Sequence, residues 1–312
     1  RASGTNAVRY GTMRENVLNV TAVMANGEII RTGSRAKKSS AGYDLTRLLV
    51  GSEGTLGVIT EVALRLYGIP ESIVAAVCPF PSVEACCNAT ITAIQMGLPV
   101  ARIELVDAEH VKAFNAYSHL DLAVSPTLFL EFHGTVASAR EQAETFAAIA
   151  EELGGGPYRW AEKEEDRQKL WQARHDAFWA TRSLMPGKDA FATDVCVPIS
   201  RLAECVTDTQ ADLAAHGLYG PIVGHVGDGN FHVVLYCDRS DPDEVARVKG
   251  VYGRLIDRAI AMGGTCTGEH GIGSGKVAYL EREHGPALAF MRDIKRALDP
   301  KNIMNPGKNA AL

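Results

Sequence analysis

The 312-residue sequence lacks the features that mark secreted, membrane-spanning and nucleic-acid-binding proteins. Its seven cysteines include no C-x-x-C pair, and an odd count argues against a fully paired disulfide scaffold, so we expect a reducing compartment. No apolar run approaches the roughly 18 residues of a membrane span, and no charged segment followed by an apolar stretch opens the chain. The net charge is -5 and the sequence contains no long basic run, so it lacks the cluster of positive charge that nucleic-acid binding requires.

The chain also begins without methionine. Arg1 leads directly into a small polar segment with no preceding element to cover it, so we expect a fragment of a longer protein. With 46% hydrophobic and 22% charged residues, the composition is that of an ordinary globular protein, long enough for two domains.

One short segment brings two histidines together. Residues 224–232 have the sequence Gly-His-Val-Gly-Asp-Gly-Asn-Phe-His, and an Asp-Gly pair between two strand-like segments predicts a two-residue hairpin turn. In that hairpin His225 and His232 are directly opposed, with Cβ atoms roughly 4.5–5.5 Å apart. Two imidazoles at this separation can bind one divalent ion. The alternative is a pair of histidines that merely flank a turn.

A glycine-dense segment downstream supplies two more polar side chains. Residues 263–273 include Glu269 and His270, and adjacent residues of an extended segment point to opposite sides. We therefore expect different roles for them. Glu269 would complete a set of two histidines and one carboxylate, which suits Zn²⁺, Mn²⁺ or Fe²⁺, and His270 would act in proton transfer. The alternative is a solvated glycine-rich loop.

Apolar periodicity predicts the remaining organisation. A hairpin is expected over 16–34 and a strand over 58–67, with a boundary at Pro70. From 71 to 162, strands alternate with helices, which predicts a ferredoxin-like antiparallel sheet with helices on one face. A helix over 163–186 places Arg174 on an aromatic face, where it either forms a salt bridge or binds a ligand. Further helices are expected over 44–50, 201–215, 242–262 and 286–298.

Five motifs in one order resemble a known family. They are Ser-Gly-Thr-Asn-Ala-Val-Arg-Tyr-Gly at 3–11, Gly-Ser-Glu-Gly-Thr-Leu-Gly-Val-Ile-Thr at 51–60, the histidine segment at 224–232, Gly-Glu-His-Gly-Ile-Gly at 268–273 and Asn-Pro-Gly-Lys at 305–308. Together they resemble the FAD-dependent D-2-hydroxyacid dehydrogenases of the vanillyl-alcohol oxidase superfamily, closest to the cytochrome-linked D-lactate dehydrogenases. The D-2-hydroxyglutarate dehydrogenases and the flavin subunit of glycolate oxidase are nearby relatives. The resemblance covers essentially the whole chain.

The resemblance implies an α+β fold in three parts. Residues 1–68 would form the C-terminal part of an FAD-binding domain of the vanillyl-alcohol-oxidase (PCMH) type. Residues 69–289 would form a cap or substrate domain that also binds the metal, with the ferredoxin-like sheet and flanking helices. Residues 290–312 would return to the flavin.

The resemblance also implies roles for single residues. His225, His232 and Glu269 match the metal ligands, His270 matches the catalytic base, and Arg174 matches the cation that binds the substrate carboxylate. The positions expected to contact FAD are Gly4, Thr5, Asn6, Ala7, Gly11, Val17, Glu53, Gly57, Ile59 and Asn305.

The implied reaction oxidises a small D-2-hydroxy acid, D-lactate in the leading hypothesis, to the 2-keto acid. Hydride would pass to FAD, and electrons then to cytochrome c, a quinone or electron-transfer flavoprotein. Ala192 stands where D-2-hydroxyglutarate dehydrogenases carry a second cation, which favours a monocarboxylic substrate. The family's glycine-rich pyrophosphate loop would precede Arg1, so we expect this fragment alone to bind FAD poorly. The expected location is the cytoplasm, either free or peripheral to the inner membrane, or the mitochondrion if the source is eukaryotic.

Two hypotheses from other classes stay open at this point. A flavin-free metal hydrolase could use His225, His232 and Glu269 with His270 as base, although the two FAD-like glycine segments argue against it. A non-enzymatic subunit of a larger flavoprotein complex could use the same fold for assembly, but it would have no use for His270 and Arg174 together.

Overall fold

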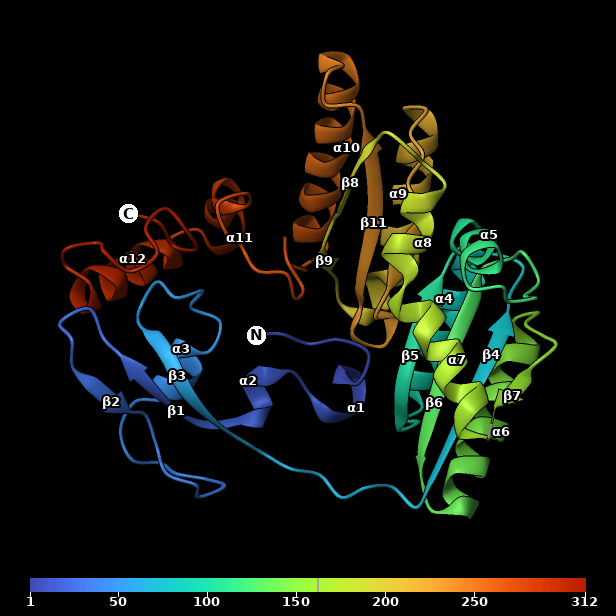
Figure 1. Ribbon diagram of the computed structural model, residues 1–312, viewed down its shortest axis with the longest axis horizontal. Helices are drawn as coiled ribbons and strands as arrows, with labels where there is room; N and C mark the ends of the chain where they lie inside the picture. The colour runs from blue at the N-terminus through green and yellow to red at the C-terminus, as the bar shows by residue number, and fades with distance from the viewer. Residues whose placement is uncertain (162) are drawn as a thin grey trace. The chain divides into compact units, whose positions relative to one another are not determined.

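The computed structural model describes residues 1–161 and 163–312, which pack into two compact units (Figure 1). The first unit combines Arg1–Gly68 with Cys266–Leu312, and the second is Ile69–Thr265. Glu162, the last residue of the expected ferredoxin-like region, lies outside the described residues. The three domains expected from the sequence, 1–68, 69–289 and 290–312, stay a prediction.

The first unit is built on a three-stranded antiparallel sheet of order β2-β1-β3. The central strand β1 carries Val17, Val20 and Ala22 into a small apolar core. Strict alternation would place Val17 and Val20 on opposite faces, and a register shift in the pairing with β3 interrupts the alternation between Val17 and Asn19. The elements in chain order are α1 (Ala7–Tyr10), α2 (Met13–Asn16), β1 (Val17–Val23), β2 (Ile29–Arg31), α3 (Leu45–Leu49), β3 (Val58–Leu64), η3 (Val277–Tyr279), α11 (Leu280–His284) and α12 (Ala287–Leu298).

A buried ion pair fastens α12 to the rest of this unit. The Nζ of Lys295 donates to the carboxylate of Asp299 and to the carbonyl oxygens of Thr55, at 2.8 Å, and Met304, at 2.9 Å. The ammonium therefore uses all three of its donors. Asp299 also accepts from the backbone N–H groups of Ile303 and Met304. Because both residues are almost fully buried, neither charge can be lost without leaving the other uncompensated.

The second unit contains an antiparallel sheet of order β7-β4-β6-β5-β10-β11-β8, with β9 paired to β11. Its first four strands and the crossover helices α4 and α6 reproduce the ferredoxin-like order expected from the sequence. The strands are β4 (Ser72–Pro79), β5 (Val100–Val106), β6 (Thr127–Gly134), β7 (Arg159–Ala161), β8 (Asp189–Ala192), β9 (Val195–Cys196), β10 (Ile222–Gly224) and β11 (Asn230–Cys237).

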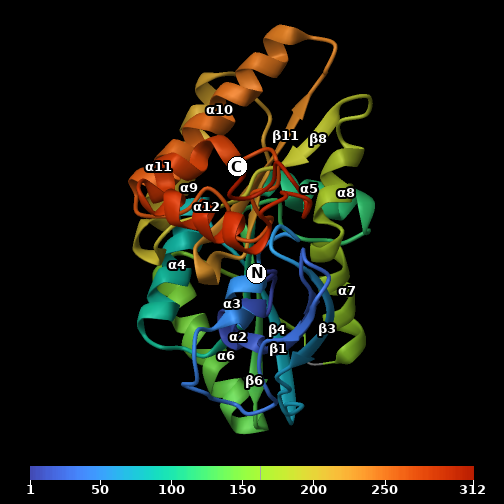
Figure 2. The ribbon, with the colours of Figure 1, turned by 90° about the vertical axis from the view of Figure 1, so that its left-hand side faces the viewer.

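Helices cover both faces of this sheet, whereas the sequence predicted helices on one face (Figure 2). Phe132 of β6 contacts Phe146 of α6, while Phe129, an odd number of residues away and so on the opposite face, contacts Trp171 of α7. The single helix expected over 163–186 is divided at Asp176 into α7 and α8. The helices of this unit are α4 (Val83–Gln95), α5 (Ala108–Tyr117), α6 (Val136–Glu152), α7 (Glu164–His175), α8 (Ala177–Ser183), η1 (Ile199–Arg201), α9 (Leu202–Ala215), η2 (Val226–Asp228) and α10 (Pro242–Ala261).

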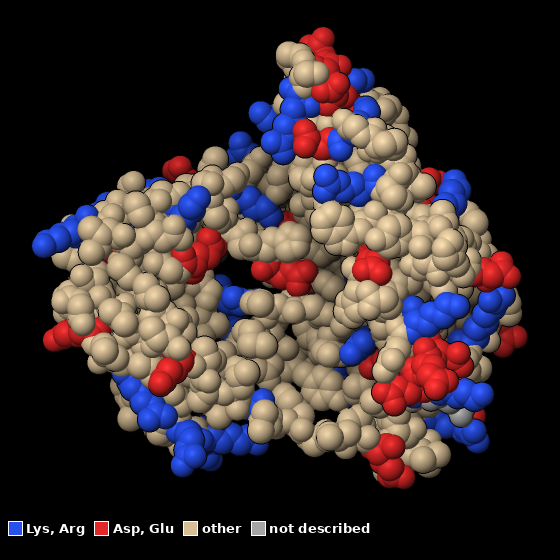
Figure 3. All heavy atoms as spheres, viewed as in Figure 1, with Lys and Arg blue, Asp and Glu red and all other residues tan. Residues whose placement is uncertain are grey.

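Charged side chains of both signs are intermixed over the visible face of the second unit (Figure 3). Arg254 of α10, for example, donates to Asp212 of α9 at 2.8 Å, and this contact joins the two helices. Within the described part of the chain, no helix is both long and apolar enough to cross a membrane.

The buried ion pair of α12 predicts a stability difference between two matched variants. Lys295→Met leaves the Asp299 carboxylate buried without its cation, so the free energy of unfolding should fall by about 3–5 kcal/mol. Arg296→Met on the same helix breaks only the exposed pair with Asp293 and should cost under about 1 kcal/mol. Urea unfolding of both variants measures the difference, and equal costs would contradict the assignment.

The same pair predicts how this difference depends on pH. Burial, the largest influence, raises the pKa of Asp299, but the hydrogen bonds from Lys295, Met304 and Ile303 outweigh it and hold the pKa below its ordinary value. A depressed carboxyl pKa contributes stability that is present above the unfolded-state pKa and is lost as the pH falls through the folded-state value. The advantage of the unmodified chain over Lys295→Met should therefore shrink as the pH falls through the range in which Asp299 takes up a proton.

Candidate functional site

The two histidines of the 224–232 segment flank the connection between β10 and β11. This connection is the single 3-10 turn η2 followed by Gly229 in the left-handed conformation, with φ 77°. The sequence predicted a two-residue turn with His225 opposite His232, and that register is wrong: His232 pairs with Val223. The reason is that η2 and Gly229 together reverse the chain, so the turn is longer than the Asp-Gly pair suggests.

Packing against β9 explains why the turn takes this form. A Cβ on Gly229 would lie 2.0 Å from the carbonyl oxygen of Val197, so only glycine fits there. The thiol of Cys196 donates to the carbonyl oxygen of Asp228 at 3.2 Å. Burial raises the pKa of this thiol to about 12, which keeps the donor proton in place. The turn is thus held from outside the hairpin.

The two imidazoles still face one another. His225 lies two residues beyond Val223, the partner of His232, so both rings project from the same face of the sheet. Their centroids are 5.7 Å apart with planes at 84°, and one ring nitrogen of each lies within 4.8 Å of the other. Both side chains are largely buried.

Hydrogen bonds set the tautomer of both rings. The Nδ1 of His225 lies 2.8 and 2.9 Å from the two carboxylate oxygens of Glu104, and the Nδ1 of His232 lies 2.8 Å from the carbonyl oxygen of Thr193. A carboxylate and a carbonyl only accept, so each Nδ1 carries a proton, and in its neutral form each ring would have its lone pair on Nε2. Proteins orient metal-binding imidazoles in this way, and the donor set therefore fits a divalent ion.

Glu104 also binds Arg174. The sequence analysis did not identify Glu104 as a site residue. The Nη2 of Arg174 donates to Oε2 of Glu104 at 2.5 Å, and the two side chains are 9% and 1% exposed. The Nε of Arg174 has no hydrogen-bond partner among the described residues. The feature of the sequence that could have identified Glu104 is that it is the single carboxylate within the apolar strand 100–106. A charge buried in such a strand requires partners.

Glu269 and His270 belong to the first unit. Glu269 accepts a hydrogen bond from the hydroxyl of Ser3 at 2.6 Å through Oε2, and its other oxygen lies 3.8 Å from Nε2 of His270. The His270 side chain is 46% exposed and that of Glu269 14%. An imidazole exposed to this degree can exchange protons with solvent, as a general base must.

Glu53 organises the loop that carries these two residues. Its backbone has φ 54°, and its carboxylate accepts from the N–H groups of Ile272 and Gly273, both at 2.7 Å. Asn305 donates to the carbonyl oxygen of Glu53 at 2.6 Å. Three glycine-containing segments that are distant in the sequence therefore meet at Glu53. A contact between Glu53 and FAD stays a prediction.

The other positions expected to contact FAD also lie in the first unit. Thr5, Asn6 and Ala7 lie at the start of α1, Gly11 caps its end with φ 77°, Val17 begins β1, and Gly57 and Ile59 lie at the start of β3. At Gly4, where φ is 126°, no atom lies within 4 Å of the place that a Cβ would take. The backbone there is open to a ligand, which fits a cofactor wall.

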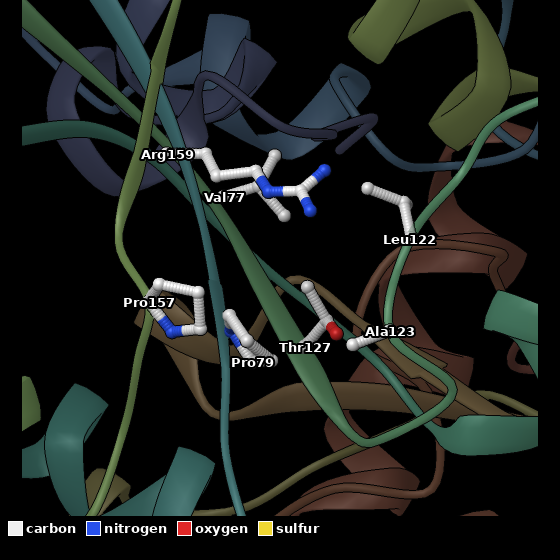
Figure 4. A pocket seen from close by; sticks show the side chains of 7 residues that line it. All are labelled: Val77, Pro79, Leu122, Ala123, Thr127, Pro157 and Arg159. Atoms are coloured by element: carbon white, nitrogen blue, oxygen red, sulfur yellow. The ribbon is translucent and has the colours of Figure 1, made fainter.

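A separate pocket of the second unit lies near one end of β4 and β6 (Figure 4). Its only charged lining side chain among the described residues is that of Arg159, which donates to the carbonyl oxygen of Asp121 at 3.1 Å. None of the candidate site residues lines it. The remaining lining residues are Val77, Pro79, Leu122, Ala123, Thr127 and Pro157.

The family described as FAD linked oxidases, C-terminal domain, matches residues 69–309. A probable mitochondrial D-lactate dehydrogenase of Danio rerio is 56% identical over 98% of this chain and 63% of its own length. A mitochondrial D-lactate dehydrogenase [cytochrome] of Arabidopsis thaliana is 46% identical over 99% of this chain and 54% of its own length.

A solved structure shows the same fold. The 4-ethylphenol oxidase of Gulosibacter chungangensis aligns with a TM-score of 0.72 at 17% identity, over 98% of this chain and 69% of its own. This likeness confirms the expected α+β fold class.

The chain spans between about half and two thirds of the length of the two D-lactate dehydrogenases. The chain belongs to the FAD-linked oxidases and carries their C-terminal domain at residues 69–309.

Proposed function

We propose that this chain takes part in the FAD-dependent oxidation of a D-2-hydroxy acid, D-lactate first among them, to the 2-keto acid. The observation that carries the proposal is the pair of facing imidazoles at His225 and His232, each held at Nδ1 by an acceptor of the protein, in a member of the FAD-linked oxidases. The names of the two D-lactate dehydrogenases support the substrate class. A flavin-free metal hydrolase built on the same residues does not fit the family.

We propose Glu269 as the third metal ligand. Thr265 forms an antiparallel bridge with Cys196, and Cys196 pairs with Asn230 at the start of the strand that carries His232. Glu269 follows Thr265 by four residues, so the covalent chain keeps their Cα atoms within about 14 Å. Two imidazoles and one carboxylate suit Zn²⁺, Mn²⁺ or Fe²⁺. When bound, such an ion supplies Lewis-acid chemistry that lowers the pKa of the substrate hydroxyl.

Arg174 would bind the carboxylate of the substrate. A guanidinium offers five donors in a fixed fork, and its contact with Glu104 leaves the Nε donor unpaired among the described residues. A substrate carboxylate can accept from this edge, which would fix the position of its α-carbon. Ala192 offers no second cation, so a monocarboxylic acid is favoured over a dicarboxylic one.

His270 would take the hydroxyl proton of the substrate. Its half-exposed ring suits a base that must return its proton to solvent after each turnover. When bound, FAD supplies the acceptor for the hydride that leaves the α-carbon. The residues proposed to hold FAD are Gly4, Thr5, Asn6, Ala7, Gly11, Val17, Glu53, Gly57, Ile59 and Asn305.

The names of the relatives also guide the choice of acceptor and location. Both names include the word mitochondrial, which favours a mitochondrial over a cytoplasmic location. One name also includes the word cytochrome, which favours cytochrome c over a quinone or electron-transfer flavoprotein as the electron acceptor. The second candidate activity is the oxidation of glycolate, because a glycolate oxidase subunit of Bacillus subtilis is 34% identical over 98% of this chain.

Flavin reduction tests the proposed activity directly. The full-length, FAD-loaded protein is mixed anaerobically with D-lactate, L-lactate, glycolate or D-2-hydroxyglutarate, and the flavin absorbance is followed. D-lactate should bleach the flavin fastest and L-lactate should not bleach it. Prior removal of the metal with a chelator should suppress bleaching. If no D-acid and no glycolate bleaches the flavin, the proposed activity is wrong.

A histidine substitution tests the division of roles between Glu269 and His270. His270→Ala should slow flavin reduction by about 10²–10⁴-fold, because the base is lost, and should leave the bound metal in place. His284→Ala, in the same unit, serves as the control and should change neither quantity. Metal content is measured by elemental analysis. Loss of metal from His270→Ala would mean that His270, and not Glu269, is the ligand.

A further inference from the structure

We propose that Glu104 is a positioning residue shared by His225 and Arg174, so that metal binding and substrate binding depend on one buried carboxylate. The inference rests on the proposed roles of His225 and Arg174. It assigns to Glu104 no contact with substrate, metal or cofactor.

The sheet places Glu104 opposite His225. β10 pairs with β5 in an antiparallel register that sets Gly224 against Leu105 and Val223 against Val106. One step further along this register, His225 falls opposite Glu104, where the two side chains share a face. The contact of 2.8 Å between Nδ1 and Oε1 thus lies one residue beyond the last residue of β10 that pairs with β5.

Arg174 reaches the same carboxylate from α7, on the face of the sheet where Phe129 contacts Trp171 of that helix. Glu104 is 1% exposed, so its charge has little access to water and depends on these two donors. Its loss would do two things at once. The Nδ1 of His225 would lose the acceptor that fixes its tautomer, and Arg174 would lose the anion that holds its guanidinium.

The neighbouring strand supplies a matched control. Glu131 of β6 is 5% exposed, pairs with Arg102 at 3.3 Å and contacts Nε2 of His133 at 2.7 Å. It therefore repeats the arrangement of one buried carboxylate between an arginine and a histidine, in the same sheet. Neither Arg102 nor His133 is a candidate ligand, so substitution of Glu131 reports the structural cost alone.

The test compares Glu104→Gln with Glu131→Gln in the full-length, FAD-loaded protein. Metal affinity is measured by competition of Zn²⁺ or Mn²⁺ with a chelator, and kcat and KM for D-lactate are measured at saturating metal. Glu104→Gln should weaken metal binding by about 10–100-fold, because it removes the charged partner of a ligand imidazole. It should also raise KM more than it lowers kcat. Glu131→Gln should leave metal affinity and KM unchanged.

A second variant covers the case in which Glu104→Gln does not fold. Glu104→Asp keeps the charge that Arg174 needs but shortens the reach by one methylene, so metal affinity and KM should both worsen, by less than in Glu104→Gln. Unchanged metal affinity in either variant overturns the inference. Weakened metal binding with an unchanged KM would mean that Glu104 positions His225 but not Arg174, which contradicts the shared role. If the unmodified protein binds no metal or oxidises no D-acid, the proposed function fails first.

Discussion

The arrangement of the candidate site in the second unit depends on one physical constraint: a buried carboxylate must have hydrogen-bond partners. Glu104 lies inside an apolar strand, where an unpaired charge would cost several kcal/mol. It receives hydrogen bonds from His225 and Arg174, and these contacts fix one imidazole tautomer and one guanidinium at the same time. The carbonyl oxygen of Thr193 fixes the ring of His232 in the same way. Both imidazole rings are then oriented by the protein before any ligand arrives, which is the preorganisation that a binding site requires.

The first unit shows the same reliance on buried polar contacts. Glu53 holds the loop of Glu269 and His270 through two backbone N–H groups, and Lys295 with Asp299 holds the C-terminal helix against the segment of Thr55. Glycine-rich loops have little side-chain packing of their own, so a carboxylate or an ammonium that satisfies several backbone groups determines their conformation. The chemistry proposed for His270 therefore depends on residues that need not touch the substrate.

Much of the fold could be predicted from the sequence, because it follows from local periodicity. Alternating strands and helices gave the ferredoxin-like order β7-β4-β6-β5, and the helices near 201–215, 242–262 and 286–298 are present as α9, α10 and α12. The turn at Asp228 could not be predicted, because its form is set by the contact of Gly229 with Val197, a residue of another segment. Glu104 was missed for the same reason, since its partners lie 70 and 121 residues away. The roles of His225, His232, Glu269, His270 and Arg174 stay predictions.

X-ray absorption at the metal edge tests the central claim most directly, namely that His225 and His232 bind a divalent ion through Nε2. The full-length protein is loaded with one equivalent of Zn²⁺, and its spectrum is compared with that of the His225→Ala/His232→Ala double variant. The account predicts two imidazole nitrogens at about 2.0–2.1 Å in the unmodified protein and loss of this imidazole signal in the variant. Zinc bound without imidazole scattering, or with the same scattering in both proteins, would contradict it.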